Sequence, residues 1–117
     1  EVLDGLPTRD AVSWCALITG YVEYGRAYEA LNCFEQMKTE GLSPDAVTFI
    51  CALKACSMTR SIEMGEELHI ELTKQRLLEK NHNLANALVK MYVKCGVLEK
   101  AQILYDEKDP DQYGKLQ

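Results

Sequence analysis

The sequence predicts an all-α fold in which helix–turn–helix units stack into an α-solenoid. Apolar residues recur at helical spacing through most of the 117 residues, and glycines and prolines interrupt them at intervals. Several unrelated positions also repeat in one register, first after thirty-five residues and then after thirty-six. Because a single helical hairpin cannot bury both of its faces, such units are expected to gain stability by stacking on their neighbours.

Several slots of this unit recur in all three copies. The run 14–18 aligns with 49–53 and then with 85–89, and all three runs are rich in apolar and small residues. One slot holds only small residues, namely Ala30, Gly65 and Ala101. Another slot holds only flat rings, namely Phe34, His69 and Tyr105. We expect the small slot to let the two helices of a hairpin approach closely, and the ring slot to fill space between neighbouring units.

Six helices are predicted from the apolar spacing and from the residues that interrupt it. The first has its apolar residues between Val12 and Val22 and is broken by Gly25, and the second has them between Ala30 and Met37 and ends at Gly41. The other four cover about residues 46–58, 62–76, 83–94 and 98–105. Asp45 stands where the third helix needs an N-cap. In the fourth helix, the side chains expected to face inward are Ile62, Leu68, Leu72 and Thr73.

The units are expected to have unequal lengths, spanning residues 11–45, 46–81 and 82–112. Residues 1–10 are expected to be the tail of a preceding unit, and residues 113–117 a frayed C-terminus. The chain is therefore expected to be a segment of a longer array.

The composition limits the functions open to this chain. A net charge of −5 argues against a generic nucleic-acid binder, although a basic stripe on one face is compatible with it. No run approaches the roughly 18 consecutive apolar residues of a membrane span, so no membrane partner is expected. The five cysteines are odd in number and include no C-x-x-C pair, which disfavours a disulfide framework or a zinc site and suits a reducing compartment.

Catalysis is not expected from this chain. His69-Ile70-Glu71 matches the H-x-E half of a zinc deaminase signature, but the P-C-x-x-C half is missing and His69 occupies the ring slot. The sequence holds two histidines, and neither has an assignable nucleophile or carboxylate partner. We therefore expect no enzyme activity, no metal, no cofactor and no small-molecule substrate.

Three stretches of the chain resemble the pentatricopeptide repeat family of plant organelles. They are Val12-Ser13-Trp14-x-Ala16-Leu17-Ile18-x-Gly20-Tyr21, Gly41-Leu42-Ser43-Pro44-Asp45-x-Val47-Thr48-Phe49 and Asn86-Ala87-Leu88-Val89-x-Met91-Tyr92-x-Lys94-Cys95-Gly96. The unequal units also resemble the subclass that mixes ordinary (P), long (L) and short (S) repeats, here 11–45, 46–81 and 82–112 in that order. The resemblance implies a right-handed superhelix in a mitochondrion or chloroplast. Such an array binds single-stranded RNA as part of a larger RNA editing or processing factor.

The resemblance also implies which side chains meet the RNA, with one base for each unit. One slot that reads the base falls on Cys15, Ile50 and Asn86. The second falls on the last residue of each unit, namely Asp45, Asn81 and Gln112, with Asp10 for the unit before. Val12 and Val47 fall in the slot that clamps the base between neighbouring units.

Further slots implied by the resemblance are only partly filled. The position for a phosphate-binding residue, near the end of each first helix, holds Glu23, Met58 and Lys94, and only the last is basic. Asn83 joins Lys94 among the expected RNA contacts. Since this segment has few such contacts, it is expected to bind RNA weakly when alone.

The slots that read the base depart from the family's pattern in two units. Cys15 offers only a thiol, a weak hydrogen-bonding group, and Ile50 has no polar group with which to read a base. The resemblance implies a purine for Cys15 with Asp45, and a pyrimidine for Asn86. Asn86 is the strongest single candidate for base contact, because a polar residue in this apolar stretch has no evident structural need.

The alternative function is a protein–protein scaffold of the kind built by the related tetratricopeptide arrays. Apolar Ile50 and Met58 on one helix would then dock other editing-complex proteins or a second copy of the chain. Preferential binding of one RNA sequence, and its loss on replacing Asn86 or Asp45, would discriminate between the two functions.

Overall fold

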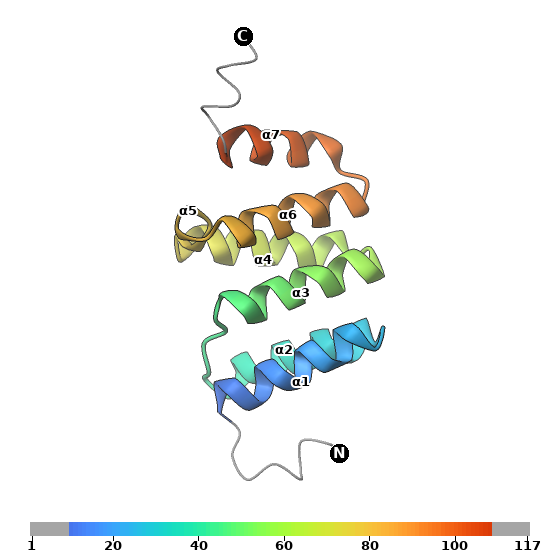
Figure 1. The fold of residues 1–117 in the computed structure, drawn as a ribbon, viewed down its shortest axis with the longest axis vertical. Coiled ribbons are helices and arrows are strands. Elements are labelled where there is room, and N and C mark those ends of the chain that lie inside the picture. The colour runs from blue at the N-terminus through green and yellow to red at the C-terminus, as the bar shows by residue number, and fades with distance from the viewer. Residues whose placement is uncertain (1–9, 109–117) are drawn as a thin grey trace.

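A computed structural model describes residues 10–108, which form seven α-helices and no strand. The helices are α1 (Ala11–Glu23), α2 (Ala27–Thr39), α3 (Ala46–Thr59), α4 (Ile62–Lys74), α5 (Leu77–Lys80), α6 (His82–Lys94) and α7 (Leu98–Lys108). They stack into a body of 56 × 25 × 20 Å that follows the order of the chain (Figure 1). The predicted all-α solenoid of helical hairpins is thereby confirmed. The expectations for residues 1–9, Gln112 and 113–117 lie outside the described residues.

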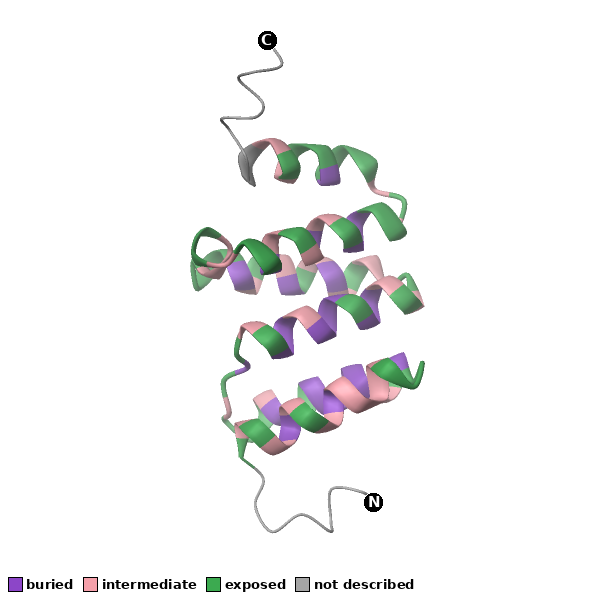
Figure 2. Ribbon diagram, in the orientation of Figure 1, coloured by how far each residue is buried: buried purple, intermediate pink, exposed green. Residues whose placement is uncertain are grey.

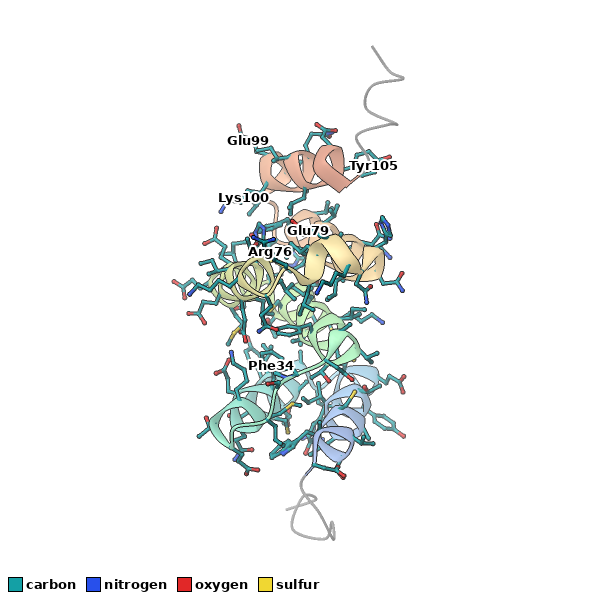
Figure 3. All side chains as sticks on the ribbon, turned by 90° about the vertical axis from the view of Figure 1, so that its left-hand side faces the viewer. Phe34, Arg76, Glu79, Glu99, Lys100 and Tyr105 are labelled. Atoms are coloured by element: carbon teal, nitrogen blue, oxygen red, sulfur yellow. The ribbon has the colours of Figure 1, made fainter. Side chains whose placement is uncertain are left out.

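The hairpins form two layers of helices. The first-helix layer consists of α1, α3 and α6, and the second-helix layer of α2, α4 and α7. Helix α3 packs against α1 on one side and α6 on the other, and each first helix also packs against the second helix of its own hairpin. Seen from the side, α2 and α4 line up on one side of the stack and α1, α3 and α6 on the other (Figure 3). Helices α1, α3 and α6 therefore share one exposed face.

Local signals place the start of each first helix. The side chains of Asp10, Asp45 and Asn81 are the N-caps of α1, α3 and α6, and each accepts a hydrogen bond from a backbone N–H of the first turn. These starts lie at Ala11, Ala46 and His82, in the thirty-five- and thirty-six-residue register of the sequence. The expectation that Asp45 caps the third helix is confirmed.

The core runs along the stack between the two layers. Buried side chains face the neighbouring helices, whereas exposed residues cover the outer surfaces (Figure 2). The largest fully buried side chains include Trp14, Phe34, Phe49, Leu53 and Tyr92. Leu68 and Leu72 of α4 are buried as expected, but the prediction for Thr73 is wrong. Thr73 is exposed, one residue past Leu72 on the helical wheel, and its hydroxyl donates to the His69 carbonyl.

The predicted ring slot lies between units where a following unit is present. Phe34 packs edge-on against Phe49 of α3, and His69 packs edge-on against Tyr92 of α6. The small slot has a different neighbour from the expected one at Gly65. A Cβ on Gly65 would lie 2.5 Å from the Sδ of Met91, which belongs to the next unit and not to the partner helix of the same hairpin. The missing side chain of Gly65 makes room for α6.

The fourth predicted helix is shorter than expected. It ends at Lys74, and Arg76 then adopts a left-handed backbone with φ 56° before the short helix α5. Arg60 also adopts φ 56°, in the register position that Gly25 and Gly96 occupy with φ 77° and 83°. An L side chain in this region costs about 1–2 kcal/mol relative to glycine. None of the described helices is both long enough and apolar enough to cross a membrane.

Candidate functional site

A groove of about 290 Å³ opens on the first-helix layer between α3 and α6. Its lining residues are Ile50, Lys54, Ser57, Asn83, Asn86, Ala87 and Lys90. Three of the residues singled out in the sequence, Ile50, Asn83 and Asn86, therefore meet in one place. The floor is partly apolar, and the amide and ammonium groups supply the polar contacts.

The two asparagines of the groove come from the first half of α6. Asn83 and Asn86 are three residues apart in this helix, so they lie on neighbouring turns of the same face, and both are exposed. Each carboxamide offers a carbonyl acceptor and an NH₂ donor. Ile50, on the facing helix, is half-buried and packs against the core. The groove thus sets amide groups opposite the apolar side chain of Ile50.

The described residues that are expected to read the base from the unit ends, namely Asp10, Asp45 and Asn81, are all helix caps. Asp45 Oδ1 accepts from the Thr48 backbone N–H at 2.9 Å and from the Thr48 hydroxyl at 2.8 Å. These bonds, that of the backbone N–H first, hold the pKa of Asp45 below its usual value. The carboxylate is therefore ionised at neutral pH, acts only as an acceptor, and remains exposed. Asn81 Oδ1 accepts from the backbone N–H groups of Asn83 and Leu84, and its amide nitrogen takes no part in these cap bonds.

The clamp residues expected from the sequence are exposed apolar side chains. Val12 is 77% exposed on α1 and Val47 is 54% exposed on α3. Each lies two residues after the cap that precedes its helix. Cys15 is half-buried on α1. None of these three residues lines the groove between α3 and α6.

The lysines that give the groove its positive charge were not predicted from the sequence. Lys94, the expected phosphate contact, is exposed in the last turn of α6 but does not line the groove. The lining lysines are Lys54 and Lys90. Each lies four residues after a slot expected to read the base, Ile50 or Asn86, and therefore one turn along the same helical face. That spacing was available in the sequence as a signal.

Formal charge is divided unequally between the two layers. The first-helix layer carries −1 on α1, +1 on α3 and +2 on α6, so its helices are net +2. The second-helix layer carries −1 on α2, −3 on α4 and −1 on α7, so its helices are net −5. A larger groove of about 650 Å³ on the second-helix layer is lined in part by Glu29 and Glu35. The chain's acidity thus does not describe the groove between α3 and α6.

The histidine of the H-x-E sequence is used for packing. His69 Nδ1 lies 2.8 Å from the Tyr92 hydroxyl, and the two rings meet edge-on at 5.7 Å between centroids. Within residues 10–108, no group of three or more histidine, cysteine or acidic side chains is placed to hold a metal ion. All five cysteines are free thiols, and burial raises the pKa of Cys56 to about 12, so that thiol is protonated and unreactive.

Comparisons with known proteins agree with the geometry of the helical pairs. A model of the PPR repeat family matches residues 9–58, and a model of the PPR repeat matches residues 85–107. A pentatricopeptide repeat-containing protein of Arabidopsis thaliana is 34% identical over 107 residues, which is 92% of this chain and 18% of that protein. A second, named as chloroplastic, is 38% identical over 94% of this chain and 12% of its own length. A third, named as mitochondrial, is 39% identical over 91% of this chain and 15% of its own length.

The chain spans between 10% and 20% of the length of the Arabidopsis relatives that it matches. All of these relatives are named as pentatricopeptide repeat-containing proteins, and some are named as chloroplastic or mitochondrial. The chain therefore contains pentatricopeptide repeats, and plant proteins built from the same repeat are its homologues.

Proposed function

We propose that this segment of pentatricopeptide repeats binds single-stranded RNA with sequence preference through its first-helix layer. The observation that carries the proposal is the groove between α3 and α6, where Asn83 and Asn86 meet two lysines and no acidic side chain. Amide groups opposite the apolar side chain of Ile50 suit an unstacked base, and ammonium groups suit the phosphates that flank it.

The other expected contacts supply the remaining parts of such an interface. Asp45 is an ionised acceptor at the start of α3, which suits the N–H donors on the edge of a purine. Asn81 holds the same place before α6. Val12 and Val47 are exposed apolar side chains at the start of their helices, suited to clamp a base from the side. Cys15 is the weakest member of the set, because a thiol forms poor hydrogen bonds.

The wider assignment follows from the resemblance and the relatives. We propose that residues 11–45, 46–81 and 82–112 are P, L and S repeats of an editing or processing factor. The names of several relatives favour a mitochondrion or chloroplast as its place of action. Catalysis would then reside outside this segment, and single-stranded RNA would be its principal partner.

The test is a titration of the whole protein that carries this segment with labelled single-stranded RNAs, selected from a random pool. Asn86→Ala is expected to reduce the preference at one base and to weaken binding to the selected sequence by about 1–3 kcal/mol. Asn32→Ala is the matched control, because Asn32 is exposed on α2 and lines the groove of the other layer. The proposal is wrong if the pool yields no preferred sequence, or if both variants bind alike.

Asp45 allows a second test that leaves the cap intact. Asparagine caps a helix about as well as aspartate, so Asp45→Asn is expected to change stability little. It replaces an acceptor by a group with both donor and acceptor, and so is expected to shift the base preferred at that unit. A selected sequence identical to that of the wild type would exclude Asp45 from base contact.

One observation favours a protein partner as the second candidate function. Tyr28 is 74% exposed and lines the groove of the second-helix layer together with Met64. Met58 is also exposed, at the end of α3. These apolar surfaces would serve docking of another protein or of a second copy, in which case light scattering would detect dimers. Dimers that lack RNA binding would favour this candidate.

A further inference from the structure

Lys54 and Lys90 occupy equivalent places in the second and third units. They are thirty-six residues apart in the chain, the same step that relates α3 to α6. Both line the groove between these helices. The equivalent position of the first unit is Thr19, which is half-buried and whose hydroxyl lies 3.3 Å from the Cys51 Sγ. The paired positive charge therefore belongs to one groove and not to every unit.

The two groove lysines differ in their partners from Lys38 and Lys100 of the second-helix layer. Lys38 pairs with Glu71 at 2.9 Å, and Lys100 pairs with Glu66. Lys54 and Lys90 are exposed, and among residues 10–108 neither takes part in an ion pair or hydrogen bond. Helices α3 and α6 contain no acidic residue that would compete for them. Their charge is available to an anion from outside.

The chemistry of the groove separates two tasks. Ile50, on α3, has no polar group for a base edge, whereas Asn86, on α6, carries a carboxamide. One turn further along, both helices carry a lysine, Lys54 in the second unit and Lys90 in the third. The second unit thus has an ammonium group, that of Lys54, which can bind a polyanion. At Ile50 it lacks a polar group that could hydrogen-bond to a base.

We infer that Lys54 and Lys90 bind the phosphodiester backbone of the RNA where it crosses from the second unit to the third. The second unit then contributes backbone attraction that is independent of sequence, and the third unit contributes base preference through Asn86. This inference rests on the proposed RNA-binding function. Lys94, one turn beyond Lys90 at the end of α6, lies outside the groove and is a separate candidate.

The inference is tested by the salt dependence of RNA binding by the whole protein. Binding of the selected RNA is measured between about 50 and 200 mM salt for the wild type and for Lys54→Gln/Lys90→Gln. Each phosphate contact on a single strand contributes about 0.7 to the slope of log Kd against log salt, so the double variant is expected to lose roughly 1.4. The preferred sequence is expected to remain unchanged, because the removed contacts are to phosphate.

Two further variants serve as controls for the change in slope. Lys74→Gln removes an exposed lysine at the end of α4, in the other layer, and is expected to leave the slope unchanged. Asn86→Ala is expected to change the base preference without changing the slope. Thermal melts followed by circular dichroism are expected to superimpose for the wild type and the double glutamine variant, since both lysines are exposed.

Each outcome bears on one proposal in particular. A slope for Lys54→Gln/Lys90→Gln equal to that of Lys74→Gln, with RNA still bound, overturns the lysine inference and leaves the proposed function standing. No binding of any pool RNA by the wild type overturns the proposed function and the inference with it. Poly-glutamate that displaces the RNA at equal charge concentration, with the same dependence on the two lysines, would overturn RNA as the occupant and point to an acidic protein partner.

Discussion

The two junctions between units have the same arrangement but different chemistry. At the first, Phe34 of α2 meets Phe49 of α3 edge-on, with ring centroids 5.6 Å apart. At the second, His69 of α4 meets Tyr92 of α6 edge-on at 5.7 Å. A lysine ammonium lies over a ring of each pair, Lys38 over Phe34 at 5.1 Å and Lys100 over Tyr92 at 5.7 Å.

The lysines approach their junctions from opposite directions. Lys38 belongs to the earlier unit and reaches forward to Glu71 of α4. Lys100 belongs to the later unit, and from α7 it reaches back to Glu66 of α4. The first ring pair is entirely apolar, whereas the second adds a hydrogen bond of 2.8 Å between His69 and the Tyr92 hydroxyl. A flat ring thus occupies this slot at both junctions, an apolar ring at the first and a polar ring at the second.

Removing a ring is expected to have the largest effect on the free energy of unfolding. The loss is expected to be larger at the first junction, where the ring is more deeply buried. Phe34 is fully buried, so Phe34→Ala is expected to destabilise the chain by about 3–5 kcal/mol. His69 is half-buried, and His69→Ala is expected to cost about 1–3 kcal/mol, mainly because the buried Tyr92 hydroxyl loses its partner. Urea denaturation measures both values. Equal losses would mean that the two junctions are equivalent in energy as well as in shape.

The second largest effect on stability is expected from filling the small slot at the second junction. Because a Cβ on Gly65 would meet the buried Met91 side chain, Gly65→Val is expected to cost about 1–3 kcal/mol through overpacking. Gly20 is also inside a helix, but no atom lies within 4 Å of a Cβ built on it. Gly20→Val is therefore the matched control and is expected to change stability by no more than about 0.5 kcal/mol. A harmless Gly65→Val would contradict close approach of α6 at this point.

The hydrogen bond of the second junction is expected to be replaceable when both partners change together. His69→Phe and Tyr92→Phe are each expected to cost about 1–2 kcal/mol, because each strands a polar group of the other residue. The double variant recreates the Phe34–Phe49 type of pair and is expected to lose less than the sum of the single losses. A double-mutant cycle in urea gives the coupling energy. Strict additivity would show that the hydrogen bond contributes nothing to the junction.

The dependence of stability on high pH tests the same junction through the hydroxyl of Tyr92. Burial raises the pKa of Tyr92 to about 12 from its ordinary value of 10.0. The folded chain therefore holds this proton between these two values when the unfolded chain has lost it, so stability from Tyr92 is present below pH 10 and lost as the pH rises toward 12. In Tyr92→Phe, the decline in the free energy of unfolding over this range is expected to be shallower. An unchanged decline would assign it to other groups.

The lysine pairs are expected to give the smallest effects. Their side chains are partly exposed, 32% for Lys38 and 48% for Lys100, and pairs of this kind contribute roughly 0.2–1 kcal/mol. Lys38→Met and Lys100→Met are both expected to lie in that range, with the larger loss for the less exposed Lys38. High salt is expected to reduce the difference from the wild type. A loss above about 2 kcal/mol for either would show that the cation over the ring carries more than surface pairing.

Features set by neighbouring residues were predictable, whereas features set by distant ones were not. Asp45 as a cap depends on the chemistry of its own turn, so the sequence alone sufficed. The repeat of ring positions likewise predicted the ring contacts at the junctions between units. The contact of Gly65 with Met91 depends on how two units dock, and no local pattern reports it. The early end of α4 follows from the left-handed backbone of Arg76, which carries no glycine or proline signal.

In the candidate site, too, local features were predictable from the sequence and contacts between helices were not. Asn86 was predictable because a polar residue stands out on an apolar stretch, and its partners in the groove were not, because they come from another helix. Lys54 and Lys90 are unremarkable in sequence as lysines on helices. Their joint position depends on the face that α3 and α6 share, and the four-residue spacing from Ile50 and Asn86 is its only signal in the sequence.

The division of charge between the layers makes the molecule electrically two-sided, although its total charge is −5. At low salt, where the screening length is about 30 Å at 0.01 M, a polyanion at a distance senses mainly the total charge and is repelled. At shorter range it senses whichever layer it faces, so only one orientation of approach is productive. Added salt then acts in two opposing ways. It lowers the distant repulsion that slows encounter and weakens the contact attraction that prolongs it, so association and dissociation rates are expected to both rise over part of the salt range.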